Sequence, residues 1–378
     1  MNEEPTHFAL RPSADLVKRA SKVAKANSAR KGEPAFHMTE DVRRLSTPWS
    51  VAQVRATQIE ATDLPAGVIL DAAAGSGVQL VALTAGLKRP GLAIELDPNI
   101  GLLCAANMHS AGESGDLQRS MDRVLVGDGT DAENAIVAYW NSLREAGTRA
   151  HPPIGMLHLD PARPRDAQKH EIDEMQPAIG PLMKAWSKHL EIGPRGPAVL
   201  LDLSPRLNED QRALVDATIE TTFPGITRTW EYLSQGGGRI DRLSVWIGSL
   251  SSKAPSRCVR MGRKKIMATI EGKIVESEEV AMSTPPPFGA HLTIVDPALV
   301  QSGLQEAWLE RALPEGAGHS WLRLDGRRPL LITTDRLTND EEIDAFVLAS
   351  GEIVQHRLTP PELHTIEQTA AAAARNGV

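Results

Sequence analysis

Short apolar runs alternate with longer segments of helical periodicity between residues 65 and 203. A chain that alternates in this way builds a parallel sheet, because each helix carries it back across a face of the sheet before the next strand begins. The pattern therefore predicts an α/β fold with helices on both faces. The predicted strands are Val68–Leu70, Leu92–Leu96, Val124–Val126, Ile154–Leu159 and Val199–Leu203.

Helix starts and a hairpin pattern agree with this architecture. Asp97 offers a side-chain cap and is followed by Pro98 in the first turn, and Asn208 begins a similar start after the fifth run. Farther along, Thr227–Leu233 and Arg242–Ile247 flank a glycine-rich segment, which is typical of a β-hairpin. We therefore expect the parallel sheet to end in a hairpin.

The chain of 378 residues is too long for one ordinary core and favours two or three folding units. Pro285–Pro287 marks the clearest break, because three prolines can continue neither a helix nor a central strand. The expected parts are residues 1–60 as a helical N-terminal lobe, 61–252 as the main α/β domain, 253–285 as connector strands with a proline-rich linker, and 286–378 as a small α+β domain with a tail.

The expected C-terminal domain contains one predicted helix, Pro297–Leu309, and a helical or frayed tail at Thr369–Val378. Its predicted strands are Leu292–Val295, Trp321–Leu324, Pro329–Ile332 and Phe346–Leu348.

Composition limits the classes of function. A net charge of −7 argues against nonspecific coating of nucleic acid, which depends on neutralising phosphates. No apolar stretch approaches the roughly 20 residues that span a bilayer, and the start of the chain lacks a secretory signal, so we expect a cytoplasmic protein without a membrane partner. Nothing points to DNA, and a monomer is assumed.

Two local basic clusters are compatible with RNA contact, and equally with solvated protein faces. The first comprises Arg11, Lys18, Arg19, Lys22, Lys25, Arg30 and Lys31, and the second comprises Arg257, Arg260, Arg263, Lys264 and Lys265.

A small-residue loop follows the first predicted strand, running from Asp71 through Ala73 and Gly75 to Gly77. A strand that turns sharply into a helix leaves its backbone open to a ligand only where small residues allow close approach. The second strand ends at Glu95, at the spacing where such folds place a carboxylate for ribose hydroxyls. Together these features predict a nucleoside-type ligand.

The third and fourth strand ends extend the predicted site. Asp128 follows the third strand and could accept a hydrogen bond from an adenine amino group. Asp160 and Pro161 follow the fourth, where a carboxylate could orient an acceptor for in-line transfer. His158, inside the fourth strand, is interpreted as a core residue, and the histidines lack the spacing of metal ligands.

Two departures narrow the chemistry. Dinucleotide-binding loops usually carry a third glycine three residues after the second, but Gly77 is followed by Val78 and by no glycine at that spacing. Ala73 stands at the position that is usually the first glycine of a cofactor loop.

These motifs resemble the class I S-adenosylmethionine-dependent methyltransferases that carry a C-terminal THUMP-like domain, in which Asp-Pro-Ala-Arg replaces the commoner reaction-side motif. The resemblance covers Thr47–Arg55, the cofactor loop, Leu159–Pro164, the hairpin, and residues 295–304 and 331–335. It implies a Rossmann-like seven-stranded sheet and S-adenosyl-L-methionine as cofactor. It also implies that Asp71, Gly75, Gly77 and Glu95 contact the cofactor, and that Asp160 and Pro161 form the reaction side.

The expected function is methyl transfer to RNA, with tRNA favoured, by direct in-line attack. Enzymes that resemble this chain and methylate carbon carry a cysteine just after the fifth strand, where this chain has Ser204, so a covalent cysteine intermediate is disfavoured. Two alternatives stay open: methylation of a small molecule or protein, and a binding protein that has kept the fold for S-adenosylmethionine or RNA but lost catalysis.

Overall fold

The computed structural model describes residues 6–27, 33–112, 117–161, 172–280, 285–322 and 328–354. The chain divides into two compact units. The first comprises Met1–Arg228 with Val245–Ser251, and the second comprises Thr229–Ser244 with Ser252–Val378. Residues 1–60 fall within the first unit, and the finer four-part division stays a prediction. Arg163 and the segment Thr369–Val378 lie outside the described residues.

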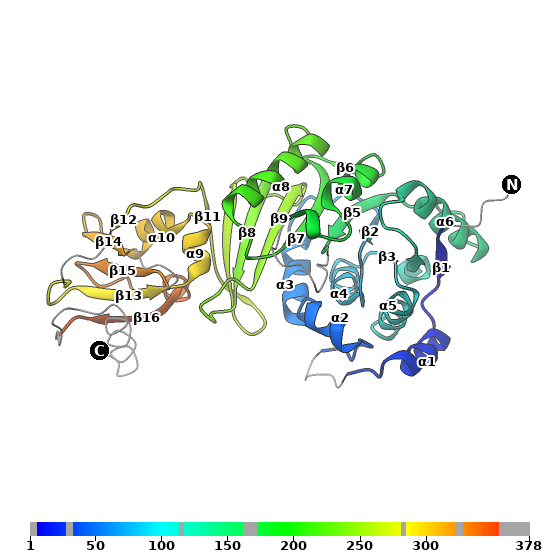
Figure 1. Ribbon diagram of the computed structural model, residues 1–378, viewed down its shortest axis with the longest axis horizontal. Helices are drawn as coiled ribbons and strands as arrows, with labels where there is room; N and C mark the ends of the chain where they lie inside the picture. The colour runs from blue at the N-terminus through cyan, green and yellow to red at the C-terminus, as the bar shows by residue number, and fades with distance from the viewer. Residues whose placement is uncertain are drawn as a thin grey trace. The chain divides into compact units, whose positions relative to one another are not determined.

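The first unit is built on a sheet in the order β1-β4-β3-β2-β5-β7, with the Val245–Gly248 part of β9 next to β7 (Figure 1). The pairs from β4 through β7 are parallel. All the strands predicted between residues 65 and 203 are therefore confirmed, as is the α/β class. Their bounds are β2 Val68–Asp71, β3 Gly91–Glu95, β4 Arg123–Val126, β5 Ile154–Leu159 and β7 Gly196–Leu203.

The predicted count of seven strands is not confirmed. A strand at the N-terminus, β1 (Phe8–Leu10), pairs antiparallel with β4, and the short β6 (Ile192–Gly193) pairs antiparallel with β7. The N-terminal segment was expected to be helical, and three residues carry too little periodicity to indicate a strand. Their pairing depends on the edge that β4 offers.

Helices cover both faces of this sheet, with α3, α4 and α5 on one side and α6, α7 and α8 on the other (Figure 1). The predicted caps are present: Oδ1 of Asp97 accepts from the backbone nitrogen atoms of Asn99 and Ile100, and Asn208 forms a capping box with Gln211. The helices are α1 Ala14–Val23, α2 Glu40–Leu45, α3 Trp49–Glu60, α4 Val78–Leu87, α5 Pro98–Ser110, α6 Ala132–Glu145, α7 Ile179–Ser187 and α8 Glu209–Thr222, with 3-10 turns at Leu117–Met121 and Ile172–Glu174.

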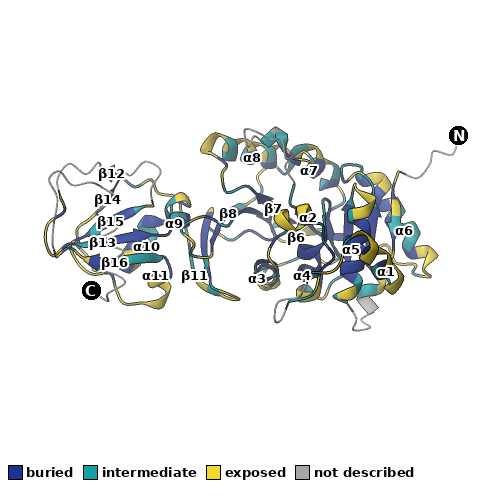
Figure 2. Cartoon of the chain, turned by 60° about the horizontal axis from the view of Figure 1, so that its bottom comes forward, coloured by how far each residue is buried: buried dark blue, intermediate teal, exposed yellow. Residues whose placement is uncertain are grey.

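Burial on both faces explains why the central strands read as continuous apolar runs (Figure 2). Every residue of β2 and of β5 is buried. The polar exceptions within these two strands are Asp71 and His158. Buried polar side chains in such strands need partners, so both residues call for an account of their contacts.

The second unit contains a smaller layer and a separate sheet. In the smaller layer, β8 (Arg228–Ser234) pairs parallel with β10 (Ser256–Met261); the first residue of β8 belongs to the first unit. β10 forms a hairpin with β11 (Ile266–Gly272). The predicted β-hairpin is formed by β8 and β9 (Arg242–Gly248). The second sheet has the order β12-β14-β15-β13-β16: β12 Glu279–Val280, β13 His291–Val295, β14 His319–Leu322, β15 Leu330–Thr333 and β16 Val347–Glu352.

The prediction of a single helix over Pro297–Leu309 is wrong, because this segment forms two helices, α9 (Pro297–Gln301) and α10 (Gln305–Ala312). Gly303 lies between them with φ of +69°, a conformation that ends a helix and suits glycine. A further short helix, α11, spans Glu341–Asp344.

Among the residues described above, no helix combines the length and the apolar character needed to cross a bilayer.

Replacing Gly303 by alanine should destabilise the second unit by about 1–3 kcal/mol. The new methyl group would occupy a left-handed position and would lie 2.5 Å from Cγ2 of Ile274. The control is Gly316→Ala, which has the same sign of φ (+83°) but open space around the methyl group. Urea unfolding of both variants separates steric overlap from backbone strain, and equal losses would contradict the role of Ile274.

Candidate functional site

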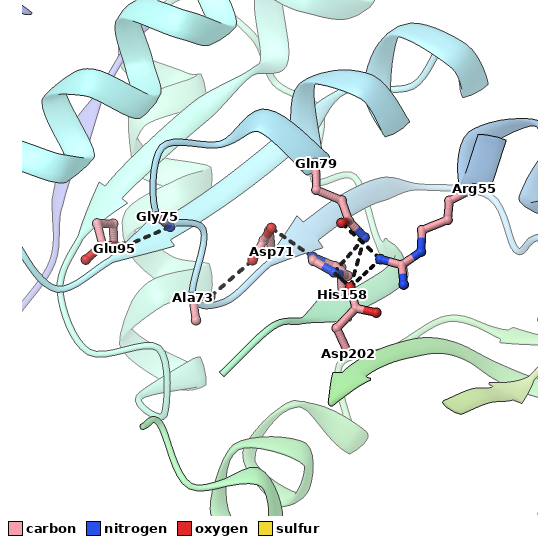
Figure 3. Close-up of polar contacts among 8 residues, drawn as sticks. All are labelled: Arg55, Asp71, Ala73, Gly75, Gln79, Glu95, His158 and Asp202. Carbon is pink, nitrogen blue, oxygen red and sulfur yellow. Dashed lines mark hydrogen bonds and ion pairs between the residues drawn. The ribbon is translucent and has the colours of Figure 1, made fainter. Parts of the chain in front are cut away.

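The cofactor loop, residues 71–77, connects the end of β2 to the start of α4 as predicted (Figure 3). Gly75 (φ +52°) faces open space, since a methyl group there would meet no atom within 4 Å. Gly77 (φ +75°) packs differently, because a methyl group there would lie 2.6 Å from Sγ of Cys104. Among the described non-glycine residues only Lys88 has positive φ, so Ala73 replaces the usual glycine without backbone strain.

Glu95 holds the open edge of this loop. Its Oε2 accepts from the backbone nitrogen of Gly75 at 2.9 Å, and its Oε1 accepts from the nitrogen of Asp97 at 3.0 Å. Burial raises the pKa of this carboxyl, partly opposed by these two hydrogen bonds. Because each carboxylate oxygen has a second lone pair, Glu95 can still accept from ligand hydroxyl groups.

The loop after β4 lies directly beside the cofactor loop. A methyl group on Gly129 would lie 2.1 Å from the carbonyl oxygen of Ala72, so only glycine fits there. Trp186 of α7 donates its Nε1 hydrogen to the Gly129 carbonyl at 2.8 Å. Asp128 is exposed at this position, and its Oδ1 accepts from the backbone and side chain of Thr130. Its carboxylate is thus oriented by its own turn.

The reaction-side motif meets the cofactor loop across an apolar hollow. Asp160 and Pro161 follow β5, both half-buried. The hollow is lined by Ala73, Leu159, Pro161, Pro177, Ile179 and Leu182. Ala73 of the cofactor loop and Pro161 after β5 therefore lie near each other.

Both carboxylate oxygens of Asp71 have partners within the protein, and its predicted contact with the cofactor stays a prediction. Its Oδ1 accepts from the backbone nitrogen of Ala73 at 3.2 Å, and its Oδ2 lies 2.8 Å from Nδ1 of His158 (Figure 3). The residue is only 3% exposed. Its carboxylate points into the protein interior and fixes the backbone of the loop at Ala73.

His158 is the centre of a buried charged network. On its other side Nε2 lies 3.1 Å from Oδ2 of Asp202, and the same oxygen accepts from Arg55 of α3 at 2.5 Å (Figure 3). We call Arg55, Asp71, His158 and Asp202 the buried quartet. No member is more than 4% exposed. Gln79 completes it, accepting from Arg55 at 3.1 Å and donating to Asp202 at 3.2 Å.

Charge balance determines the state of His158. Burial alone lowers the pKa of an imidazole, but the carboxylates of Asp71 and Asp202 outweigh it and raise the pKa of His158 to about 10. With the imidazole charged, two cations face two carboxylates, which leaves no net charge in the interior. The interpretation of His158 as an ordinary core residue was therefore incomplete.

Sequence reasoning missed Arg55, Gln79 and Asp202, and also Asn107. Asn107 of α5 donates to the carbonyl oxygen of Ser76 at 2.9 Å, which fixes the far side of the loop. One signal was present in the sequence: Asp202 interrupts an otherwise apolar strand. Its partners, on other elements, could not be identified from spacing.

The second basic cluster is divided by the fold. Arg257 is buried and forms ion pairs with Glu231 at 2.8 Å and Glu271 at 3.3 Å, and Arg260 donates to the carbonyl oxygen of Ala345. Only the turn residues Arg263, Lys264 and Lys265 of this cluster are exposed.

Neither cysteine is available as a nucleophile. Cys104 and Cys258 are both buried, and burial raises the pKa of each thiol. Within the described parts of the chain, no group of three or more histidine, cysteine or acidic side chains could hold a metal ion.

No protein-family model and no curated protein sequence matches the chain. Among solved structures it is similar to a "putative methyltransferase" from Porphyromonas gingivalis W83, at 13% identity and a TM-score of 0.53, over 95% of this chain and 76% of that one. Precorrin-6y C5,15-methyltransferase from Geobacter metallireducens GS-15 is 12% identical over 57% of this chain and 94% of its own, with a TM-score of 0.34. A "putative methyltransferase" from Streptococcus mutans in complex with SAH is 14% identical over 52% and 96%, with a TM-score of 0.33.

At this level of identity, the likeness to the P. gingivalis protein shows a shared fold. None of these three descriptions names RNA or a THUMP domain, and both stay predictions.

The stability advantage of the wild-type protein over His158→Gln should shrink as pH rises from about 6.5 to about 10. The pKa of His158 is 6.5 in the ordinary state and about 10 in the fold, so folding takes up a proton in this window. The stabilisation by the charged His158 is complete below about pH 6.5 and is lost as the pH rises through about 10. Urea midpoints across this range test it, with the exposed His151→Gln as control. A difference that does not change with pH would show that His158 is neutral.

Proposed function

We propose that the first unit is an S-adenosylmethionine-dependent methyltransferase domain with a Rossmann-like sheet. The observation that carries the proposal is the contact between Glu95 and the backbone of Gly75. It sets a carboxylate with free lone pairs beside a glycine that faces open space, as ribose recognition requires. The shared fold with a protein described as a methyltransferase supports it.

The strand order supports the same reading. From β4 to β7 it runs β4-β3-β2-β5-β7, so β3 and β4 are added on one side of β2, and β5 and β7 on its other side. In open α/β sheets ligands bind at the carboxyl ends of the strands at such a switch point. Asp71, Glu95, Asp128 and Asp160 all stand at these carboxyl ends.

The chemistry proposed is direct in-line transfer. Methyl transfer depends chiefly on bringing an acceptor into line with the sulfonium methyl group, so orientation and exclusion of water are the main contributions of the protein. Asp160 would orient the acceptor, and the apolar hollow beside Pro161 would exclude water. Covalent catalysis by cysteine is not proposed, since both thiols are buried.

RNA, with tRNA favoured, is the acceptor proposed from the sequence, and the exposed Arg263, Lys264 and Lys265 are the residues of the second unit that would contact it. One observation favours the second candidate, a small molecule or protein: the ion pairs of Arg257 remove charge from the predicted basic surface. A binding protein without catalysis is the third candidate.

Adenosylhomocysteine should bind to the wild-type protein, and about 10- to 100-fold more weakly to Glu95→Gln, because a charge-assisted hydrogen bond to the ribose is lost. Isothermal titration calorimetry measures both, with the exposed Glu145→Gln as the matched control. Equal affinity of Glu95→Gln and wild type would remove Glu95 from the site, and no binding to the wild-type protein would refute the proposed cofactor.

The acceptor class is tested with a tritiated methyl donor and two pools, bulk tRNA and an extract depleted of nucleic acid. Reversing Arg263, Lys264 and Lys265 to glutamate should reduce transfer to tRNA and weaken its salt dependence, because phosphate contacts are lost. Asp160→Ala should abolish transfer to either pool. Incorporation only into the depleted extract would favour the second candidate, and cofactor binding with no incorporation would favour the third.

A further inference from the structure

We propose that His158 is a positioning residue for the cofactor: its Nδ1 holds Asp71, and Asp71 holds the cofactor loop in its binding conformation. The inference rests on the proposed function for its ligand, but the geometry on which it depends lies wholly within the first unit. His158 touches no ligand in this scheme and acts through Asp71.

The two oxygen atoms of Asp71 have different tasks. Oδ1 accepts from the backbone nitrogen of Ala73, so it sets the path of the loop where the chain leaves β2. Oδ2 lies 2.8 Å from Nδ1 of His158. Because the two oxygens belong to one rigid group, the imidazole that fixes one fixes the direction of the other. Gly75, two residues beyond Ala73, is the open position that Glu95 holds.

The imidazole is itself fixed from behind. Its Nε2 faces Asp202 of β7, and Asp202 is held by Arg55 of α3 and by Gln79 of α4. Every side chain in this series is at least nine-tenths buried, so water cannot replace a lost contact at low cost. The loop conformation is therefore linked to helix α3 through side chains at the ends of β2, β5 and β7.

If His158 only supported the fold in general, losing the contact at Nδ1 and losing the contact at Nε2 would affect the cofactor loop equally. Buried ion pairs add little net stability, because desolvation of the charges offsets their attraction. What differs between the two sides is the consequence of losing a contact: the Nδ1 side leads to the loop backbone at Ala73, whereas the Nε2 side leads to the side chains of Arg55 and Gln79. An experiment that removes one side at a time distinguishes positioning from general support.

His158→Asn and His158→Gln form a matched pair for this purpose. Both remove the imidazolium charge. The amide nitrogen of asparagine falls near the former Nδ1 and can still donate to Asp71. That of glutamine falls near the former Nε2, beside Asp202 and Gln79, and cannot donate to Asp71. Both variants should lose stability, and only His158→Gln should release the loop.

The first readout is hydrogen exchange of a peptide spanning residues 71–77 in the ligand-free protein. Exchange should be faster in His158→Gln than in His158→Asn at matched thermal stability. The second is adenosylhomocysteine affinity, expected to be about tenfold weaker in His158→Gln than in His158→Asn. In an active enzyme the KM for the cofactor should rise while kcat changes little.

Equal exchange in the two variants, at equal loss of stability, would overturn the inference. If the wild-type protein binds no adenosylhomocysteine, the proposed function falls, while the exchange comparison still decides the role of His158. If both variants fail to fold, Asp71→Asn and Asp202→Asn provide the same comparison. Faster loop exchange in Asp71→Asn alone supports positioning, and equal exchange in the two overturns it.

Discussion

The buried quartet is the constraint on which the site depends. Two carboxylates placed inside a sheet would repel each other and lose their hydration, a cost of several kcal/mol for each ion. Arg55 and the charged His158 offset both effects by supplying two cations at hydrogen-bond distance. The arrangement joins the ends of β2, β5 and β7 to helix α3. A loop that begins at Asp71 therefore starts from a fixed point.

What the sequence could predict was set by local rules. The strands near Val68, Leu92 and Val124 follow from apolar runs, and the start of α5 follows from Asp97, whose side chain caps the helix as expected. The positions at the carboxyl ends of the strands follow from the topology of parallel sheets. These rules place Glu95 and Asp160 at one edge without any knowledge of their contacts.

What the sequence could not predict depends on contacts between distant residues. β1 forms because β4 offers an unpaired edge, and the break at Gly303 suits a close approach to Ile274. Arg257 reads as a surface cation in a basic cluster, yet it pairs with Glu231 in a neighbouring strand. The sequence places Asp71 at the end of a strand, where it lies, but its carboxylate contacts a histidine 87 residues away, which no local pattern indicates.

The site accordingly separates residues that shape it from residues that can contact a ligand. Asp71 and His158 are buried and lie at hydrogen-bond distance from each other, so their contact stabilises the conformation of the loop. Glu95 and Gly75 lie at the open edge and keep the capacity to bind. Ala73 fits this division: its backbone nitrogen serves the shaping residues, and its methyl group lines the hollow shared with Pro161. An alanine is compatible with the path of the loop here because the position does not have a positive φ.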